Sequence, residues 1–99
     1  LLEKACTGGS FDACNHLAIL YESGLGTPKN DIKAIKNYEK ACNGNVATAC
    51  YNLGVKYARG AGVKKDEFIA LELYQKACSL NLSIGCESYD LLKNELASK

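Results

Sequence analysis

The sequence is poor in several residue types, and each scarcity excludes some classes of fold or function. It has one proline, Pro28, and no stretch alternates apolar and polar residues as a half-buried strand does, so the pattern favours helices throughout. The formal net charge of +1 gives no electrostatic footprint for nucleic acid. No apolar run is long enough to cross a membrane. The one histidine, His16, is too few for a zinc site built on histidines.

Cysteine, by contrast, is abundant and regularly placed. Six cysteines form three pairs whose members are eight positions apart. An even number at regular spacing indicates disulfides in an oxidising compartment, and locality favours Cys6–Cys14, Cys42–Cys50 and Cys78–Cys86. Structural zinc and reduced cysteines in a cytosolic protein are the two alternatives. Zinc ligands commonly come in pairs about two to four residues apart, a spacing that these cysteines do not match.

The cysteines belong to a repeat of 36 residues. The segment 35–42, IKNYEKAC, returns as LELYQKAC at 71–78, and LEKAC at 2–6 is a shortened copy. Turn glycines and apolar residues recur at the same offset, as in Gly24 with Gly60 and Leu17 with Leu53. A fixed period of this length indicates a solenoid of stacked units. We therefore predict an all-α fold, an α/α solenoid of antiparallel helix pairs.

Turn and capping signals divide the chain into helices. We predict helices at residues 1–6, 11–23, 31–43, 46–59, 67–79 and 82–97. Apolar spacing of three and four residues predicts the inward-facing side chains, which are Ala13, Leu17, Tyr21, Ile32, Ile35, Tyr38, Cys42, Ala49, Leu53, Tyr57, Phe68, Leu71, Tyr74 and Cys78. Gly54 lies inside a predicted helix, where glycine costs about 1 kcal/mol relative to alanine, so we expect a close helix–helix approach there.

The repeat also predicts the domain organisation. Residues 1–99 form one domain with a partial N-terminal repeat at 1–10, repeats at 11–46 and 47–82, and a C-terminal capping helix at 83–97. Lys93 stands at the place of Tyr57, as expected of a terminal unit with a polar outer face. The sequence has no initiator methionine and starts inside a repeat, so we expect a mature or trimmed fragment, without its signal peptide, of a longer parent.

The most complete unit resembles the Sel1-like repeat. The residues that carry the resemblance are Ala49, Leu53, Gly54, Tyr57, Gly60 and Gly62, followed by Asp66, Ala70, Tyr74, Lys76 and Ala77. The cysteine spacing is similar to that of the Helicobacter cysteine-rich proteins, a secreted branch of this family. The resemblance implies a right-handed superhelix related to tetratricopeptide repeats, location in the periplasm or outside the cell, and protein binding on a concave face built from the first helix of each pair. It also implies penicillin binding with weak β-lactamase activity.

The residues themselves do not favour catalysis. Serine β-lactamases use Ser-x-x-Lys, and a lysine three positions on is missing after each serine, namely Ser10, Ser23, Ser79, Ser83, Ser88 and Ser98. Paired cysteines leave no thiolate nucleophile. We therefore assign no catalytic residue, metal or cofactor, and keep β-lactam binding as the alternative function.

A binding surface is the principal functional prediction. The helix face opposite Ala49 and Leu53 carries the candidates Tyr51, Asn52, Val55, Lys56 and Arg59, and the first unit contributes Asn15 and His16. These positions vary between units while the core positions do not. An amide can bond to a peptide backbone, and a lysine or arginine can pair with a carboxylate. A solvated helix face without a ligand is the alternative. We predict a protein or peptide partner on the concave face, and no nucleic acid partner.

Overall fold

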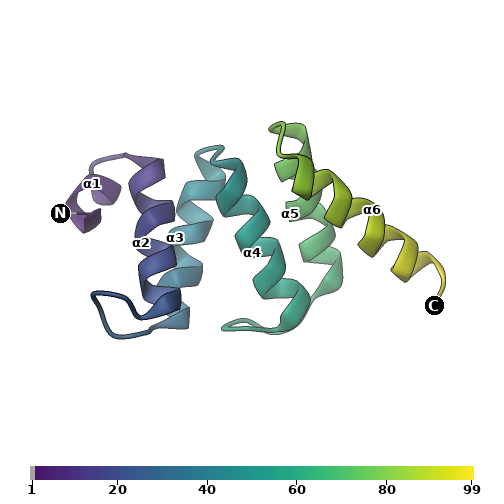
Figure 1. The fold of residues 1–99 in the computed structure, drawn as a ribbon, viewed down its shortest axis with the longest axis horizontal. Helices are drawn as coiled ribbons and strands as arrows, with labels where there is room; N and C mark the ends of the chain where they lie inside the picture. Colours follow the sequence, from purple (N-terminus) through teal and green to yellow (C-terminus); the bar gives the residue numbers. More distant parts are fainter. Residues whose placement is uncertain (1) are drawn as a thin grey trace.

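The computed structural model describes residues 2–99, and the prediction for Leu1 lies outside them. The chain folds into helices joined by short turns, which are α1 (Leu2–Thr7), α2 (Phe11–Ser23), α3 (Asp31–Asn43), α4 (Ala47–Arg59), α5 (Glu67–Ser79) and α6 (Ser83–Ala97). Each helix packs against its neighbours in sequence, giving an elongated body of 45 × 25 × 16 Å. In Figure 1, α2, α4 and α6 lie in front of α3 and α5, so first and second helices form two layers. The predicted all-α solenoid with local disulfides is confirmed.

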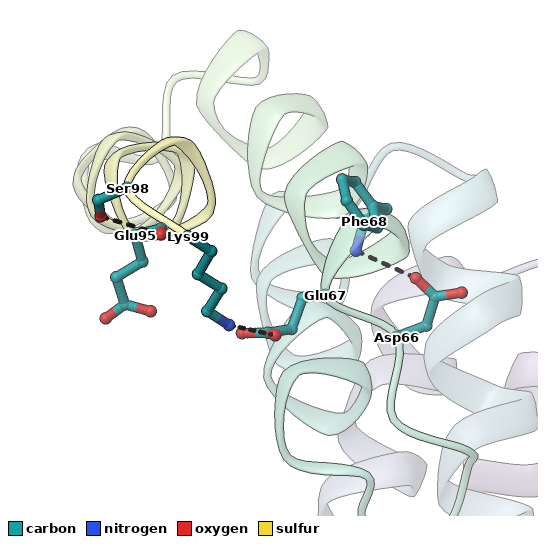
Figure 2. Close-up of polar contacts among 6 residues, drawn as sticks. All are labelled: Asp66, Glu67, Phe68, Glu95, Ser98 and Lys99. Atoms are coloured by element: carbon teal, nitrogen blue, oxygen red, sulfur yellow. Dashed lines mark hydrogen bonds and ion pairs between the residues drawn. The ribbon is translucent and has the colours of Figure 1, made fainter.

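Polar side chains fix the starts of three helices. Ser10 and Asn30 are the N-caps of α2 and α3, and each accepts a hydrogen bond from a backbone N–H three residues on. Asp66 caps α5 by accepting from the backbone N–H of Phe68 at 3.0 Å (Figure 2) and from that of Ile69 at 3.1 Å. A side-chain oxygen at this position satisfies one of the N–H groups that a helix start leaves free, which is why these residue types mark helix starts in a sequence.

The other helix ends follow from backbone conformation. Val46 and Leu82 are N-caps without a capping side chain, so α4 and α6 each begin one residue later than predicted. The first helices α2 and α4 end at Gly24 and Gly60, whose φ angles of 74° and 70° are left-handed. Glycine adopts this conformation without a steric penalty, and the chain can turn there into the second helix of the pair.

A disulfide closes each turn from a second helix to the next first helix. The pairs are Cys6–Cys14, Cys42–Cys50 and Cys78–Cys86, with Cα–Cα distances of 4.7, 4.6 and 4.5 Å. Three residues after the first cysteine of each pair, the chain takes a positive φ, at Gly9, Asn45 and Asn81. The same tight turn therefore recurs in every unit and brings the start of one helix beside the end of the previous one.

Small residues let the helices approach closely. Ala34, Ala41, Ala49, Ala70 and Ala77 are fully buried. A Cβ atom at Gly54 of α4 would lie 2.8 Å from Cε1 of Tyr74 on α5. The expected close approach at Gly54 is therefore present, and the Tyr74 ring lies directly on the α4 backbone.

Two predicted inward residues are exposed instead. Ile32 and Phe68, at equivalent places near the starts of α3 and α5, are 64% and 68% exposed, so their assignment to the core was wrong. At roughly 100° per residue, Ile32 lies about 120° around the helix from the fully buried Tyr38, outside the buried arc. The three-residue spacing from Ile32 to Ile35 suggested a shared face, but Ala34 occupies the inner position in that first turn.

The C-terminal end of α6 returns to the start of α5. The Nζ atom of Lys99 lies 3.3 Å from Oε1 of Glu67, and the Ser98 hydroxyl donates to the Glu95 carbonyl at 3.1 Å (Figure 2). Lys99 is largely exposed, so this ion pair contributes little to stability. Packing of α6 on α5 depends instead on Gly85, where an added Cβ would lie 2.7 Å from Cβ of Ala77.

Replacing Cys42 and Cys50 together by serine should lower the free energy of unfolding by about 2–3 kcal/mol, the chain-entropy value for a loop of this size. Both cysteines are buried, at 3% and 0% exposure, in the middle of the stack. Urea unfolding of the oxidised variant and the oxidised wild type measures the difference.

Peptide mapping of the unreduced wild type is the control, and it should recover only the local pairs. Equal unfolding midpoints for the variant and the wild type, or a cross-unit disulfide in the map, would contradict this account of the junctions.

Candidate functional site

Residues 36 positions apart occupy equivalent places on the first helices and form rows across α2, α4 and α6. The central row is apolar and consists of Ile19, Val55 and Leu91. Ile19 and Leu91 are 40% and 68% exposed, and Val55 is partly buried. The flanking rows are mostly polar and consist of His16, Asn52 and Ser88 on one side and Ser23, Arg59 and Glu95 on the other. We call these nine residues the first-helix face.

The candidate residues from the sequence lie in three different environments. His16 and Arg59 are exposed, whereas Tyr51, Asn52 and Val55 are partly buried. Asn15 and Lys56 are each 8% exposed. The last two therefore lie in the seam between α2 and α4, where Nδ2 of Asn15 contacts Thr48 and Nζ of Lys56 contacts Glu22.

Asn15 and Thr48 join α2 to α4 near the starts of these helices. The side-chain amide of Asn15 donates to the Thr48 hydroxyl at 3.2 Å. The Oδ1 atom of Asn15 is buried and has no hydrogen-bond partner among the described residues. The contact therefore joins the two helices through the amide group of Asn15 alone.

Glu22, Lys56 and Tyr38 join the same two helices nearer their C-terminal ends. Glu22 of α2 forms an ion pair with Lys56 of α4, whose side chain is 10% exposed. The Tyr38 hydroxyl, from α3 in the second layer, donates to Oε1 of Glu22 at 2.6 Å. One carboxylate thus serves a buried ammonium and a buried phenol, and it connects three helices.

The ionisation of this group follows from its contacts. Burial of the Glu22 carboxylate acts to raise its pKa, but the hydrogen bonds from Lys56 and Tyr38 and the positive charge of Lys56 outweigh burial and hold the pKa below its ordinary value. Burial, together with the hydrogen bond to Glu22, raises the pKa of Tyr38 far above its ordinary value. At neutral pH the group therefore consists of a carboxylate, an ammonium and a neutral phenol.

Sequence reasoning did not find Glu22. The available signal is a pair of opposite charges, Glu22 and Lys56, separated by 34 residues, close to one repeat length. Residues about one repeat apart lie on neighbouring first helices, so such a pair can meet across the seam. The same contact changes the prediction for Lys56, because its ammonium is already neutralised.

The seam between α4 and α6 is apolar at the equivalent positions. Ala58 stands where α2 has Glu22, and Leu92 stands where α4 has Lys56. Both belong to an apolar cluster around Tyr74, and the ring centroid of Tyr51 lies 5.7 Å from that of Tyr74. The two seams of the first-helix layer therefore differ in chemistry although the backbone repeats.

Other features of the described residues do not add to this face. Across residues 2–99, three His, Cys, Asp or Glu side chains nowhere gather closely enough to hold a metal ion. In the same range, every helix is too short or too polar to cross a membrane. An open hollow of about 780 Å³ lies at the N-terminal edge between α1 and α2, lined partly by Leu17, Leu20 and Tyr21, outside the first-helix face.

Replacing Glu22 by glutamine should lower the free energy of unfolding at pH 7 by about 1–2 kcal/mol, because the buried Lys56 loses its counter-charge. This is less than for a fully buried pair, since the Glu22 side chain is 36% exposed. The unfolded carboxyl binds a proton more readily than the folded one, so the contribution is complete well above pH 4.5, the ordinary value, and is lost as the pH falls through the lowered folded pKa. Urea unfolding between pH 3 and pH 7 measures both effects.

The matched control is Glu22→Gln combined with Lys56→Met, which removes both charges. The double variant should recover part of the loss, because no unpaired ammonium stays buried. If Glu22→Gln unfolds like the wild type across this pH range, the ion pair is not a stabilising contact.

Solved structures with the same fold provide the first comparison. A Sel1 repeat protein from Oxalobacter formigenes superimposes with a TM-score of 0.87 at 31% identity, covering 90% of this chain and 67% of that one. Helicobacter pylori cysteine-rich protein B gives a TM-score of 0.84 at 38% identity, covering 87% of this chain and 65% of that one. A protective antigen of uropathogenic Escherichia coli, described as displaying an SLR fold, gives a TM-score of 0.85 at 30% identity. The match covers 88% of this chain but only 19% of the antigen.

The sequence was also compared with curated proteins and with protein-family profiles. No match was found among curated proteins. The Sel1 repeat profile matches residues 11–46 and 47–82, which together make up most of the chain. Two consecutive matched units, and structural neighbours at 30–38% identity, agree with the helix pairs and turns described above. The chain therefore belongs to the Sel1 repeat family.

Proposed function

We propose that this chain is part of a disulfide-stabilised binding scaffold that holds a protein or peptide on its first-helix face. The observation that carries the proposal is the apolar row of Ile19, Val55 and Leu91, exposed at Ile19 and Leu91 and partly buried at Val55, which runs between polar rows across three helices. Apolar contacts flanked by polar groups are the usual composition of a binding surface. The face belongs to helices held by disulfides and buried alanines, so the residues on it are positioned before a ligand arrives.

Three of the predicted residues suit direct contact with a ligand. Asn52 carries a donor and an acceptor for a peptide backbone, and Arg59 and His16 are exposed at the two sides of the apolar row. Asn15 and Lys56 do not contact the ligand in this proposal. They hold α2 against α4 through Thr48 and Glu22, and so set the spacing of the contact residues.

We infer further that the protein works in an oxidising compartment, outside the cell or in the periplasm. All six cysteines are in disulfides. Disulfides persist in secreted and periplasmic proteins and are rare in the cytosol. The similarity to a cysteine-rich protein of Helicobacter pylori supports this location.

The β-lactam alternative has no comparable support. The serines lack the lysine that a Ser-x-x-Lys site needs, and the polar group around Glu22 contains neither a serine nor a free thiol. We therefore put forward the binding function alone.

Peptides selected from a displayed random library against the oxidised protein can test the proposal. Calorimetry with a selected peptide should show about five- to tenfold weaker binding to Asn52→Ala and to Arg59→Ala, the effect of losing one hydrogen bond. Lys56→Glu is unsuitable, because it would place a second carboxylate against Glu22.

The matched control is Lys64→Ala, an exposed lysine in the turn between α4 and α5. Its affinity should equal that of the wild type. Unchanged affinity in both face variants, or a selection that enriches no peptide, would refute binding on this face.

A further inference from the structure

Two hollows between α3 and α5 together form a groove behind α4. The first has a volume of about 200 Å³, and its apolar part is lined by Leu53, Tyr57, Ile69 and Leu73. The second, of about 440 Å³, shares Tyr57 and Ile69 with the first and adds Val63. Since α3 and α5 lie behind α4 in Figure 1, they form the walls of the groove and α4 forms its floor. We call these five residues the second-helix groove.

The preceding unit has a hollow at the equivalent place, but polar residues line it. Lys33 and Asn37 stand there at the positions of Ile69 and Leu73. The ammonium of Lys33 lies 5.4 Å from the centre of the Tyr21 ring and covers it, whereas Ile69 is an isoleucine that is 38% exposed. The same backbone therefore folds with polar residues at these positions. Apolar surface that the fold does not require indicates a docking site.

The two ends of the groove differ in charge. Lys64 and Lys65 line the hollow around Val63, and both are exposed. Their charges are available to a ligand, because the ion pairs among residues 2–99 involve other lysines. Asp66 also lines this end, but its Oδ1 atom accepts from two backbone N–H groups of α5. Glu39 lines the other hollow, so a ligand carboxylate is attracted to the lysine end and repelled from the opposite end.

We propose that the second-helix groove binds an extended segment of a partner protein that carries a carboxylate beside two apolar residues. Leu53 and Tyr57 are four residues apart on α4, as are Ile69 and Leu73 on α5, so the apolar floor extends for about 6 Å. Two residues of an extended chain span about the same length. The carboxylate of the segment lies at the lysine end.

This groove is separate from the first-helix face. Leu53 and Tyr57 are each two residues from Val55 in the sequence, which places them about 200° around α4 from it. A ligand in the groove therefore leaves the first-helix face open, and the groove does not rest on the proposed function.

Nuclear magnetic resonance titration with short peptides tests the groove. The probe is acetyl-Asp-Leu-Leu-amide, and the matched neutral peptide is acetyl-Asn-Leu-Leu-amide. The wild type should bind the aspartate peptide about three- to fivefold more tightly, the effect of one exposed ion pair. Raising the salt concentration from about 20 mM to about 500 mM should remove this preference. The backbone amides of Tyr57, Ile69 and Leu73 should shift during the titration.

Two variants and one control assign the effect to the groove. Ile69→Lys gives this position the residue type of the preceding unit, so it should abolish binding of both peptides with unchanged far-ultraviolet circular dichroism. The matched control is Ile84→Lys on α6, an isoleucine that is 45% exposed, and it should bind like the wild type. The combined variant Lys64→Gln and Lys65→Gln should lose the preference for aspartate and still bind the neutral peptide.

Equal affinity for the two peptides, binding that Ile69→Lys leaves unchanged, or no amide shift in the groove would overturn the proposal. Shifts of the same amides on concentrating the protein alone would show that a second copy occupies the groove, and would overturn the assignment to a partner protein. Shifts confined to Asn52 and His16 would place the peptides on the first-helix face. In that outcome the groove fails while the proposed function stands.

Discussion

The turn between each second helix and the following first helix is the constraint on which this structure depends. A disulfide joins the two helices across a Cα–Cα distance of 4.5–4.7 Å, and a residue with positive φ lies at the same place in every turn. Because helices in a solenoid contact only near neighbours, their arrangement is set by these local junctions. Repeating one junction places α2, α4 and α6 side by side in one layer (Figure 1). Residues that are 36 positions apart then lie on adjacent helices.

The chemical differences between the units arise where equivalent positions carry different residues on this repeated backbone. The seam between α2 and α4 has the ion pair of Glu22 and Lys56, with Tyr38 beneath it. The seam between α4 and α6 has Ala58 and Leu92 at the same places. In the first seam the Tyr38 hydroxyl donates to Glu22, and the second seam has no carboxylate at the equivalent position. The same repeated backbone thus carries a polar contact in one seam and an apolar contact in the next.

The fold was largely predictable from the sequence because its determinants are local. The cap residues Ser10, Asn30 and Asp66 begin helices by bonding to N–H groups within three residues, and the glycines at 24 and 60 end helices through their own backbone angles. The error over Ile32 and Phe68 has a physical reason. A three-residue spacing between apolar residues is compatible with a shared helix face, but the first turn of α3 and of α5 buries an alanine instead.

The sequence by itself determined the helices, their order and the turns, since each depends on residues close together in the chain. It also predicted a binding face with His16, Asn52 and Arg59, which stays a prediction. Tertiary structure alone decided that Lys56 is neutralised by Glu22 and that Asn15 lies in a seam, where it bonds to Thr48. These outcomes depend on which side chains meet between helices about one repeat apart. Periodicity indicates that such helices are neighbours, but burial and side-chain geometry determine which polar atoms are paired between them.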